Sequence, residues 1–420
     1  MYIDIFSISG YKGFREKETI KLDPHMNVFF GENGSGKSSI LYAMMIALSW
    51  LPARIGSLST NGSLIELHDI NVNTSSAELC ITCDVTGHPA VSWSLYRVKK
   101  GRPSTARSDF SDLNKYAKLL QVRIEETKEH CNVPVVGLYP VSRAGIVFPS
   151  RTRKRHSFGL LSALEKDQIW NADYKLFYEW FRDQEGAENK EKLEKGKAFV
   201  DRQLDAVRQA IYTFIPSFSD LHFQWTSPQG LMVAKKDFGD FRIEQLSGGE
   251  QCLLPMIGDL ARKLAIANPL RENPLDGDGI IFIDEVDLHL HPSWQSSIVE
   301  NLKRTFPNCQ FNISTHSPFV LSHVRPSQVF SLQADFGSIH ITQGKNTYGK
   351  DSESIYQDFM ELDSTRPVEV EEKIKEIYTL MDTDLEKAES KLRELQHIVV
   401  NDTELHKMQL IIDRKRLLGK

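Results

Sequence analysis

The sequence feature that most constrains the fold is a glycine-rich loop at residues 31–38, Gly-Glu-Asn-Gly-Ser-Gly-Lys-Ser. It fits the pattern G-x-x-x-x-G-K-[ST], follows the apolar run 27–30 and precedes a predicted helix from Lys37 to about Leu51. The pattern requires a strand before the loop and a helix after it, so that backbone N–H groups converge on phosphate groups. It therefore predicts an α/β domain in which Lys37 supplies charge to the β- and γ-phosphates of ATP and Ser38 ligates Mg²⁺.

A second motif, Leu-Ser-Gly-Gly-Glu-Gln at residues 246–251, is called the signature below. Many ATPases have a phosphate loop, but few also have this turn. Its physical role is to reach across a dimer and to hold the γ-phosphate of ATP bound by the other subunit. The signature therefore predicts ATP binding, a homodimer and a switch together.

An apolar run at residues 280–283 ends in Asp284 and Glu285. An Asp at the end of a buried parallel strand lies beside the phosphate loop and holds Mg²⁺ through water. A Glu directly after it is placed to act as the general base that polarises the attacking water. Two surface carboxylates are the alternative interpretation, and the phosphate loop earlier in the chain favours the ATP site.

Residues 314–318, Ser-Thr-His-Ser-Pro, follow a predicted strand at 310–313. A histidine at the end of the strand next to the acidic one can sense the γ-phosphate, and we expect this role for His316. A lone histidine is more often a core residue, but its order after the acidic pair favours the sensor. His289 and His291 lack a carboxylate cluster with metal-ligand spacing, which favours a structural role or an inter-subunit contact over a metal site.

The order of these motifs resembles that of the ABC-type ATPase heads of the SMC, Rad50 and RecF group. Residues 284–295, Asp-Glu-Val-Asp-Leu-His-Leu-His-Pro-Ser-Trp-Gln, are similar to a subgroup of stand-alone bacterial defence ATPases. Within that subgroup the chain most resembles the PtuA family of Septu-type and retron-associated antiphage systems. The shared motifs cover about residues 1–50 and 240–325. The resemblance implies an α/β fold, with a mixed sheet flanked by helices, an inserted helical lobe and a C-terminal helical segment.

The resemblance also implies roles for the residues at matching positions. ATP and Mg²⁺ are bound by Asn33, Gly34, Gly36, Lys37, Ser38, Ser39 and, for the metal, Asp284. The γ-phosphate of the opposing subunit is bound by Ser247, Gly248 and Gly249. Glu285 and His316 are the catalytic residues, and Asp287 is an inter-subunit acid.

Two basic residues are further candidates for the nucleotide site. Arg143 lies in the segment 139–143, Tyr-Pro-Val-Ser-Arg, at about the place where the group has its Q-loop. Lys12 lies in the turn after the first predicted strand, from which it can reach the nucleotide.

The chain is expected to have four regions. Residues 1–105 form the first part of the head, 106–220 an inserted, mostly helical lobe, 221–345 the second part of the head and 346–420 a helical interaction segment. Hydrophobic periodicity and turn residues predict the secondary structure within them. Strands are predicted at 2–8, 19–22, 27–30, 64–70, 77–98 (two strands), 133–139, 221–225, 231–233, 280–283, 309–314 and 328–332. Helices are predicted at 110–130, 158–184, 190–214 and from about 350 onward.

Composition limits the partners and the compartment. A net charge of −5 predicts no general affinity for nucleic acid, so such a contact would need a local patch such as the basic run 151–155. The apolar stretch 40–51 is too short to span a bilayer, and the N-terminus lacks the features of a signal peptide. Five scattered cysteines fit a reducing cytosol, and we expect a cytoplasmic protein. Cys80 and Cys83 lie on a predicted strand and point to opposite faces, against a metal site.

Several elements of related proteins are missing from the sequence. Residues 100–240 are too few for the long coiled coil of SMC and Rad50 proteins, and no HNH-like cluster is present. Asp382 and Asp384 match the Toprim Asp-x-Asp of OLD-type nucleases by spelling, but their surroundings have helical periodicity. We therefore expect no nuclease activity from this chain alone.

The resemblance implies an ATPase that dimerises around ATP and controls a separate effector. That effector is an HNH nuclease of the PtuB kind, and a retron setting adds a reverse transcriptase with its RNA–DNA product. Two other functions stay open from the sequence. One is a RecF- or Rad50-like repair ATPase that binds DNA directly, and the other is a structural scaffold that holds ATP as a static ligand.

Overall fold

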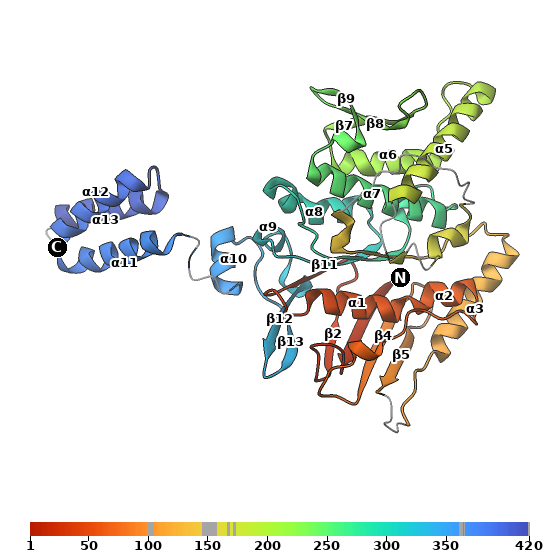
Figure 1. Ribbon diagram of the computed structural model, residues 1–420, viewed down its shortest axis with the longest axis horizontal. Coiled ribbons are helices and arrows are strands. Elements are labelled where there is room, and N and C mark those ends of the chain that lie inside the picture. The colour runs from red at the N-terminus through yellow and green to blue at the C-terminus, as the bar shows by residue number, and fades with distance from the viewer. Residues whose placement is uncertain are drawn as a thin grey trace. The chain divides into compact units, whose positions relative to one another are not determined.

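The computed structural model describes residues 1–99, 105–144, 158–165, 169–170, 174–360, 364 and 366–418. The chain divides into two compact units, Met1–Lys350 and Asp351–Lys420 (Figure 1). The basic run 151–155 lies outside the described residues.

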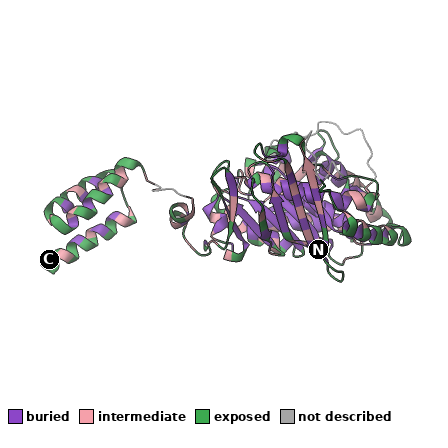
Figure 2. Cartoon of the chain, turned by 90° about the horizontal axis from the view of Figure 1, so that it is seen from below, coloured by how far each residue is buried: buried purple, intermediate pink, exposed green. Residues whose placement is uncertain are grey.

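A six-stranded sheet forms the centre of the first unit, in the order β13-β12-β3-β11-β10-β6. Its strands are β3 (Met26–Phe30), β6 (Val135–Tyr139), β10 (Gly279–Ile283), β11 (Cys309–Ser314), β12 (Val329–Asp335) and β13 (Ser338–Gln343). All neighbours run parallel except β13, which pairs antiparallel with β12. Every residue of β3, β6, β10 and β11 is buried, as expected for parallel strands covered on both faces (Figure 2).

A second, antiparallel sheet has the order β2-β1-β4-β5. Its strands are β1 (Tyr2–Ser9), β2 (Glu18–Lys21), β4 (Ser76–Asp84) and β5 (Val91–Val98). Residues of β4 alternate between half-buried and buried, so that Cys83 is buried and Cys80 faces the other side. The opposite orientation predicted for these two cysteines is therefore confirmed.

The helix after the glycine-rich loop packs between the two sheets. Helix α1 (Lys37–Leu48) contacts β4 of one sheet and β11 of the other, and is followed by α2 (Trp50–Gly56), which packs on α3 (Ser111–Glu126). Lys37–Gly56 is long and apolar enough to cross a membrane, but 72% of its apolar window is buried inside the protein. Its hydrophobicity is therefore explained by its place between the sheets.

Helices and a small sheet cover another part of the first unit, near the top of Figure 1. The sheet contains β7 (Phe218–Gln224), β8 (Gly230–Lys235) and β9 (Gly239–Arg242) in that order. The helices here are α5 (Tyr174–Lys195), α6 (Arg202–Phe214) and α7 (Gly248–Ala267), and α7 packs on both of the others. Helices α8 (Pro292–Thr305) and α9 (Pro318–Leu321) follow β10 and β11.

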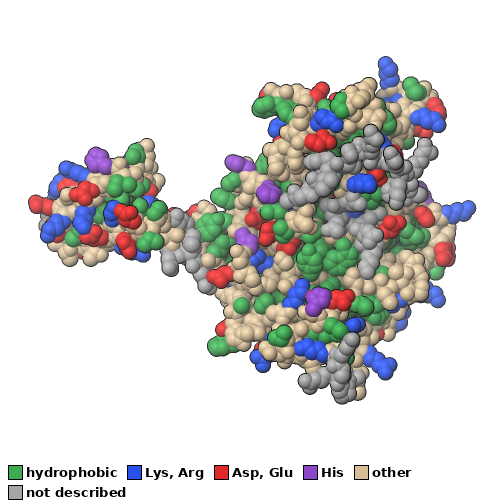
Figure 3. Space-filling model, in the orientation of Figure 1, with side chains coloured by type: hydrophobic (Ala, Val, Ile, Leu, Met, Phe, Trp, Pro, Cys, Tyr) green, Lys and Arg blue, Asp and Glu red, His purple; other side chains and the backbone are tan. Residues whose placement is uncertain are grey.

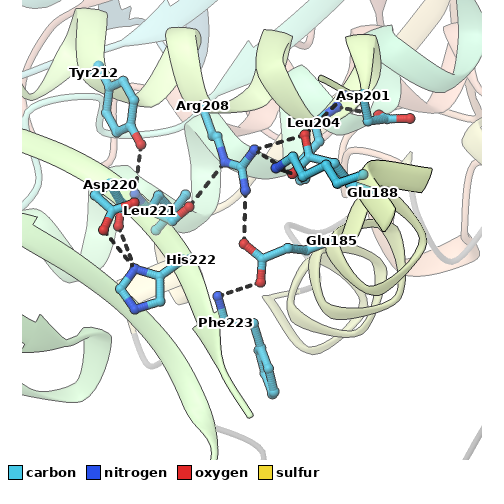
Figure 4. A network of polar contacts seen from close by, with 11 residues as sticks. Glu185, Glu188, Asp201, Leu204, Arg208, Tyr212, Asp220, Leu221, His222 and Phe223 are labelled. Atoms are coloured by element: carbon cyan, nitrogen blue, oxygen red, sulfur yellow. Dashed lines mark hydrogen bonds and ion pairs between the residues drawn. The ribbon is translucent and has the colours of Figure 1, made fainter. Parts of the chain in front are cut away.

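A half-buried arginine joins α5, α6 and β7 (Figure 4). Arg208 on α6 lies 2.8 Å from Glu185 and 3.2 Å from Glu188, and its Nε donates to the Leu221 carbonyl at 3.1 Å. The second oxygen of Glu185 accepts the Phe223 N–H at 2.7 Å. One guanidinium thus pairs with two carboxylates, of which Glu188 also pairs with Lys192 at 2.8 Å, and it fixes the small sheet to the helices.

The second unit contains α10 (Ser352–Phe359), α11 (Val368–Thr383), α12 (Leu385–Ile398) and α13 (Thr403–Leu417). The last three helices share a core that includes Ile377, Leu392 and Met408. Cationic and acidic side chains are mixed over the face of this unit seen in Figure 3. Asp384 caps α12 by accepting the Lys387 N–H, and so belongs to a helix junction, as its helical surroundings predicted.

Most predicted elements are present with shifts of a few residues at their ends, but the helices predicted at 158–184 and 190–214 are displaced by more than that, since α5 spans Tyr174–Lys195 and α6 begins only at Arg202. The strand predicted at 64–70 is wrong, because Leu67–Asp69 forms a short 3₁₀ helix. The carboxylate of Asp69 accepts the Glu66 N–H at 3.2 Å, a local bond that competes with an extended strand. Strands β9 and β13 were not predicted, since each is short or follows a tight turn without a long apolar run.

Candidate nucleotide-binding site

The carboxyl ends of three neighbouring strands bring the predicted residues to one edge of the central sheet. Strand β3 ends directly before the loop 31–38, β10 ends before Asp284, and β11 ends before Thr315. These strands are parallel and lie in the order β3-β11-β10. Ligands of open α/β sheets bind at such an edge.

The loop 31–38 has the backbone shape of a phosphate cradle. Gly34 and Gly36 have φ of 83° and 94°, a conformation that favours glycine. A Cβ on Gly36 would lie 2.5 Å from the Ile339 side chain, so no larger residue fits without movement. The Lys37 ammonium donates to the carbonyls of Gly31 and Glu32 at 2.9 and 2.8 Å, and so lies over the loop.

Three polar features of the loop fit a phosphate group. The Ser35 hydroxyl is buried and has no hydrogen-bond partner in the described chain. The N-cap of α1, Gly36, has no side chain to accept the free N–H groups of the first turn. Asn33 and Ser38 are exposed at the loop and the start of α1, and Ser39 is half-buried. The free donors and the lysine together suit an anion at a helix N-terminus.

Charged groups of several elements surround Lys37. Burial lowers the pKa of Lys37, while the carboxylates of Asp284, Glu285 and Asp287 oppose this shift. The pKa of Tyr42, on the same helix, is raised by burial and by Asp284. The three acids therefore face α1, where a bound cation or the lysine can neutralise them.

Hydrogen bonds fix the acidic strand end to β11. The Ser314 hydroxyl donates to the Asp284 carboxylate at 2.5 Å and accepts the Glu285 N–H at 2.7 Å. Asp284 is 2% exposed, whereas Glu285 is half-buried and has a φ of 48°. The Glu285 carboxylate has no hydrogen bond among the described residues, which leaves it available to a water molecule.

His316 lies within the electrostatic reach of the same groups. Burial lowers its pKa, Lys37 lowers it further, and the carboxylates of Asp287, Glu285 and Asp284 oppose both effects. A lowered pKa keeps the imidazole neutral near pH 7, so that it can donate or accept a hydrogen bond. The neighbouring Thr315 hydroxyl donates to Asp287 at 2.5 Å and holds the turn after the acidic pair.

The signature forms the exposed N-terminus of α7. Ser247 caps this helix, and its N–H and hydroxyl both donate to the Glu250 carboxylate, at 2.9 and 2.8 Å. Lys235 of β8 forms an ion pair with the same carboxylate at 2.7 Å. Ser247 and Gly248 are exposed, and a Cβ on Gly249 would lie 2.8 Å from the His289 carbonyl. These contacts orient the signature within its own chain, and none of them is with the loop 31–38.

The remaining sequence candidates have other partners. Lys12 has a φ of 47° and forms an ion pair with Asp69 at 3.5 Å, in a turn whose Phe14 lies near Gly36. The His291 ring accepts the Ser293 N–H at the start of α8, which is a structural contact. The described part of the chain has no group of three or more His, Cys, Asp or Glu residues able to hold a metal ion. A bound Mg²⁺ would thus need ligands from the phosphates as well as from Ser38 and Asp284.

The sequence analysis gave no role to Ser314 at this edge, and it gave Arg143 a different role from the one that its contacts suggest. Ser314 directly follows Ile313, which pairs with Ile283, so comparing the ends of the two strands could have identified it. Arg143 was expected near the nucleotide, but its guanidinium donates to the main-chain carbonyls of Asp284 and Glu285 at 2.5 and 2.6 Å. No local sequence signal reveals such contacts across more than 140 residues.

The fold and the arrangement of the strand ends define an ABC-type ATPase head. The chain belongs to the RecF/RecN/SMC N-terminal domain family, whose model matches residues 2–335. It is 30% identical over 390 residues to the Retron Ec83 probable ATPase of Escherichia coli, covering 78% of this chain and 70% of that protein. It is 31% identical over 155 residues to the Septu protein PtuA of Bacillus thuringiensis, covering 35% and 39% of the two chains.

A solved structure supports the fold. The SMC head bound to the C-terminal winged-helix domain of ScpA superposes with a TM-score of 0.50 at 16% identity, covering 81% of this chain and 97% of that one. At this identity the similarity concerns the fold alone.

Proposed function

We propose that this protein is the ATP-binding and ATP-hydrolysing subunit of a cytoplasmic antiphage defence complex. Two copies would close around two ATP molecules and control a separate nuclease, most simply of the HNH type. The observation that carries the proposal is the presence of two separate half-sites in the chain: Lys37, Asp284, Glu285 and His316 gather at one edge, while the signature is exposed on α7.

Each residue would have a distinct task in this site. Lys37 and the free N–H groups of the loop, with Gly34 and Gly36 at its turns, would bind the phosphates. Bound Mg²⁺ would neutralise phosphate charge and would be held by Ser38 and, through water, by Asp284. Glu285 would accept a proton from the attacking water, and His316 would bond the γ-phosphate.

The signature suggests a reason for dimerisation. Ser247 and Gly248 expose a helix N-terminus, and their contacts are with Glu250 and the region of His289 rather than with the loop of the same chain. A γ-phosphate held by another copy would complete this site. ATP would then stabilise the closed dimer, because contacts with both chains exist only in that state.

The names of the relatives support the biological setting. One relative is a retron ATPase and another is a Septu protein, and both systems defend bacteria against phages. By this likeness the partners would be an HNH nuclease of the PtuB kind and, in a retron, a reverse transcriptase with its RNA–DNA product. The unit Asp351–Lys420 folds around its own core and is a candidate for binding them.

ATP turnover and nucleotide affinity of the purified full chain test the enzymatic part. Lys37→Ala is expected to abolish ATP binding, because it removes the cation over the loop. Lys303→Ala is the matched control, since Lys303 is also partly buried with a pKa lowered by burial, but lies on α8. Equal loss of binding in both variants would contradict the site.

Association state and nuclease assays test the remaining parts. ATP should convert the chain to a dimer in light scattering, and Ser247→Arg should prevent this without loss of ATP binding to the monomer. Co-expression with the neighbouring genes should yield a nuclease whose activity responds to Lys37→Ala. Metal-dependent DNA cleavage by the pure chain would contradict the proposal that the nuclease is a separate protein.

A further inference from the structure

Arg143 is a buried arginine at the edge of the candidate site. It lies in the short 3₁₀ helix Val141–Ala144, directly after β6, and is 8% exposed. Its Nη1 donates to the carbonyls of Asp284 at 2.5 Å, Pro140 at 3.1 Å and Tyr139 at 3.4 Å, and its Nη2 donates to Glu285 at 2.6 Å. No carboxylate forms an ion pair with it in the described part of the chain.

The absence of an acidic partner separates Arg143 from an ordinary buried cation. A buried charge normally pairs with an opposite charge, because main-chain carbonyls compensate only part of the lost hydration. The planar guanidinium can, however, bond two adjacent carbonyls at fixed spacing, which a lysine ammonium cannot do. The geometry is therefore suited to holding a backbone turn in one shape.

The turn it holds contains Glu285. This residue has a φ of 48°, which is sterically unfavourable for a side chain with a Cβ. Its N–H is fixed by the Ser314 hydroxyl at 2.7 Å and its carbonyl by Arg143. With both ends of the residue bonded, the direction of the Glu285 side chain is set by these two contacts.

The donors of Arg143 point away from a direct role in nucleotide binding. Four hydrogen bonds to carbonyls use the two Nη atoms, and the side chain is almost wholly covered. It also lies beside Cys252 of α7. Burial raises the pKa of this thiol, and the nearby guanidinium opposes the shift. Arg143 thus contacts β6, the end of β10 and the helix that begins with the signature.

We propose that Arg143 is a positioning residue, which holds Glu285 in its left-handed turn so that the carboxylate faces the attacking water. This role rests on the proposed function, in which Glu285 is the general base. It acts on the chemical step and leaves ATP affinity to the phosphate loop. It also explains why the guanidinium is buried without a carboxylate partner.

Steady-state kinetics and ATP affinity of the full chain test the proposal. Arg143→Lys keeps the charge but cannot span both carbonyls, and we expect kcat to fall at least tenfold while ATP affinity changes less than twofold. Arg143→Gln, a second variant whose donors lie on a single nitrogen, should behave in the same way. Arg208→Lys is the matched control: it alters a half-buried arginine with several hydrogen bonds and should leave the kcat of the folded protein nearly unchanged.

A double variant separates positioning from a merely structural effect. If Arg143 acts through Glu285, Arg143→Lys should lower kcat less than twofold further in the Glu285→Gln background. The proposal would be overturned if the losses in kcat of the two single variants multiply in the double variant. A fall in ATP affinity as large as the fall in kcat would also overturn it. Unchanged kcat in both Arg143 variants would also overturn it while leaving the ATPase function intact. A wild-type chain that binds but never hydrolyses ATP would instead refute the proposed function itself.

Discussion

Two arginines of this chain, Arg208 half-buried and Arg143 buried, have opposite surroundings. Arg208 lies between two carboxylates, Glu185 and Glu188, and joins α5, α6 and β7 (Figure 4). Arg143 lies among main-chain carbonyls and bonds both residues of the acidic strand end. The first arrangement neutralises charge and the second shapes a turn. The difference supports the proposal that Arg143 positions Glu285, whereas Arg208 joins elements of the fold.

The two regions also differ in what they leave unpaired. In the Arg208 network the oxygens of Glu185 accept bonds from the guanidinium and from the Phe223 N–H. At the strand end the Glu285 carboxylate has no hydrogen bond among the described residues, and the nearby Ser35 hydroxyl is unpartnered. A region that is satisfied internally favours rigidity, whereas unpaired groups at an open edge suit a ligand.

The largest expected effect is on the chemical step. Glu285→Gln removes the proposed base without changing its size, and general-base catalysis typically contributes about 10²–10⁴-fold. We expect kcat to fall within that range with ATP affinity retained, measured by phosphate release and by nucleotide titration. Turnover within a factor of three of the wild type would exclude Glu285 from this role.

The next largest effect concerns stability. Arg208→Met leaves the buried Glu185 without its cation, while Glu188 keeps its ion pair with Lys192, and removing one partner of a buried ion pair costs about 3–5 kcal/mol. The free energy of unfolding from urea titration should fall by this amount, with kcat per folded molecule nearly unchanged. A selective loss of kcat in this variant would break the contrast with Arg143.

A smaller effect is expected from Ser314→Ala. This change removes the donor to Asp284 and the acceptor of the Glu285 N–H, and leaving a buried group unsatisfied costs about 1–3 kcal/mol. Both the free energy of unfolding and kcat should decrease, because the hydroxyl supports the fold and the turn together. Ser331→Ala, another buried serine of the same sheet, is the control for stability alone.

The sequence predicted the strand ends of the site better than their connections. Lys37, Asp284 and His316 were predicted because each follows an apolar strand or opens a helix, and such local patterns are visible in the chain. The contacts of Arg143 with Glu285 and of Lys235 with Glu250 depend on how distant segments pack, and no periodicity encodes them. For the same reason residues 64–70 were wrongly predicted as a strand: local bonds of Asp69 overrode an apolar pattern.

The smallest effect is a pH dependence of the free energy of unfolding, which tests how well Arg208 neutralises the Glu185 carboxylate. Burial raises the pKa of Glu185 above its usual 4.5, and the Phe223 N–H and Arg208 oppose this shift. A carboxyl whose pKa is raised on folding stabilises the protein below its unfolded pKa and loses this contribution as pH rises through the folded pKa. Relative to Glu185→Gln, the wild type should therefore lose stability as pH rises above about 4.5, by at most about 1.4 kcal/mol per pH unit until the folded pKa is passed.

The side chain of Glu185→Gln cannot ionise. The lost ion pair therefore changes the difference in unfolding free energy between the two proteins by a constant amount, whereas the titration of Glu185 makes that difference vary with pH. In the Arg208→Met background the loss should continue to a higher pH, because the cation that opposes the effect of burial is gone. Urea titrations at pH 4 to 8 measure both. An equal loss over the same pH range with and without Arg208 would mean that the guanidinium does not neutralise Glu185, and the contrast between the two arginines would then lose its electrostatic basis.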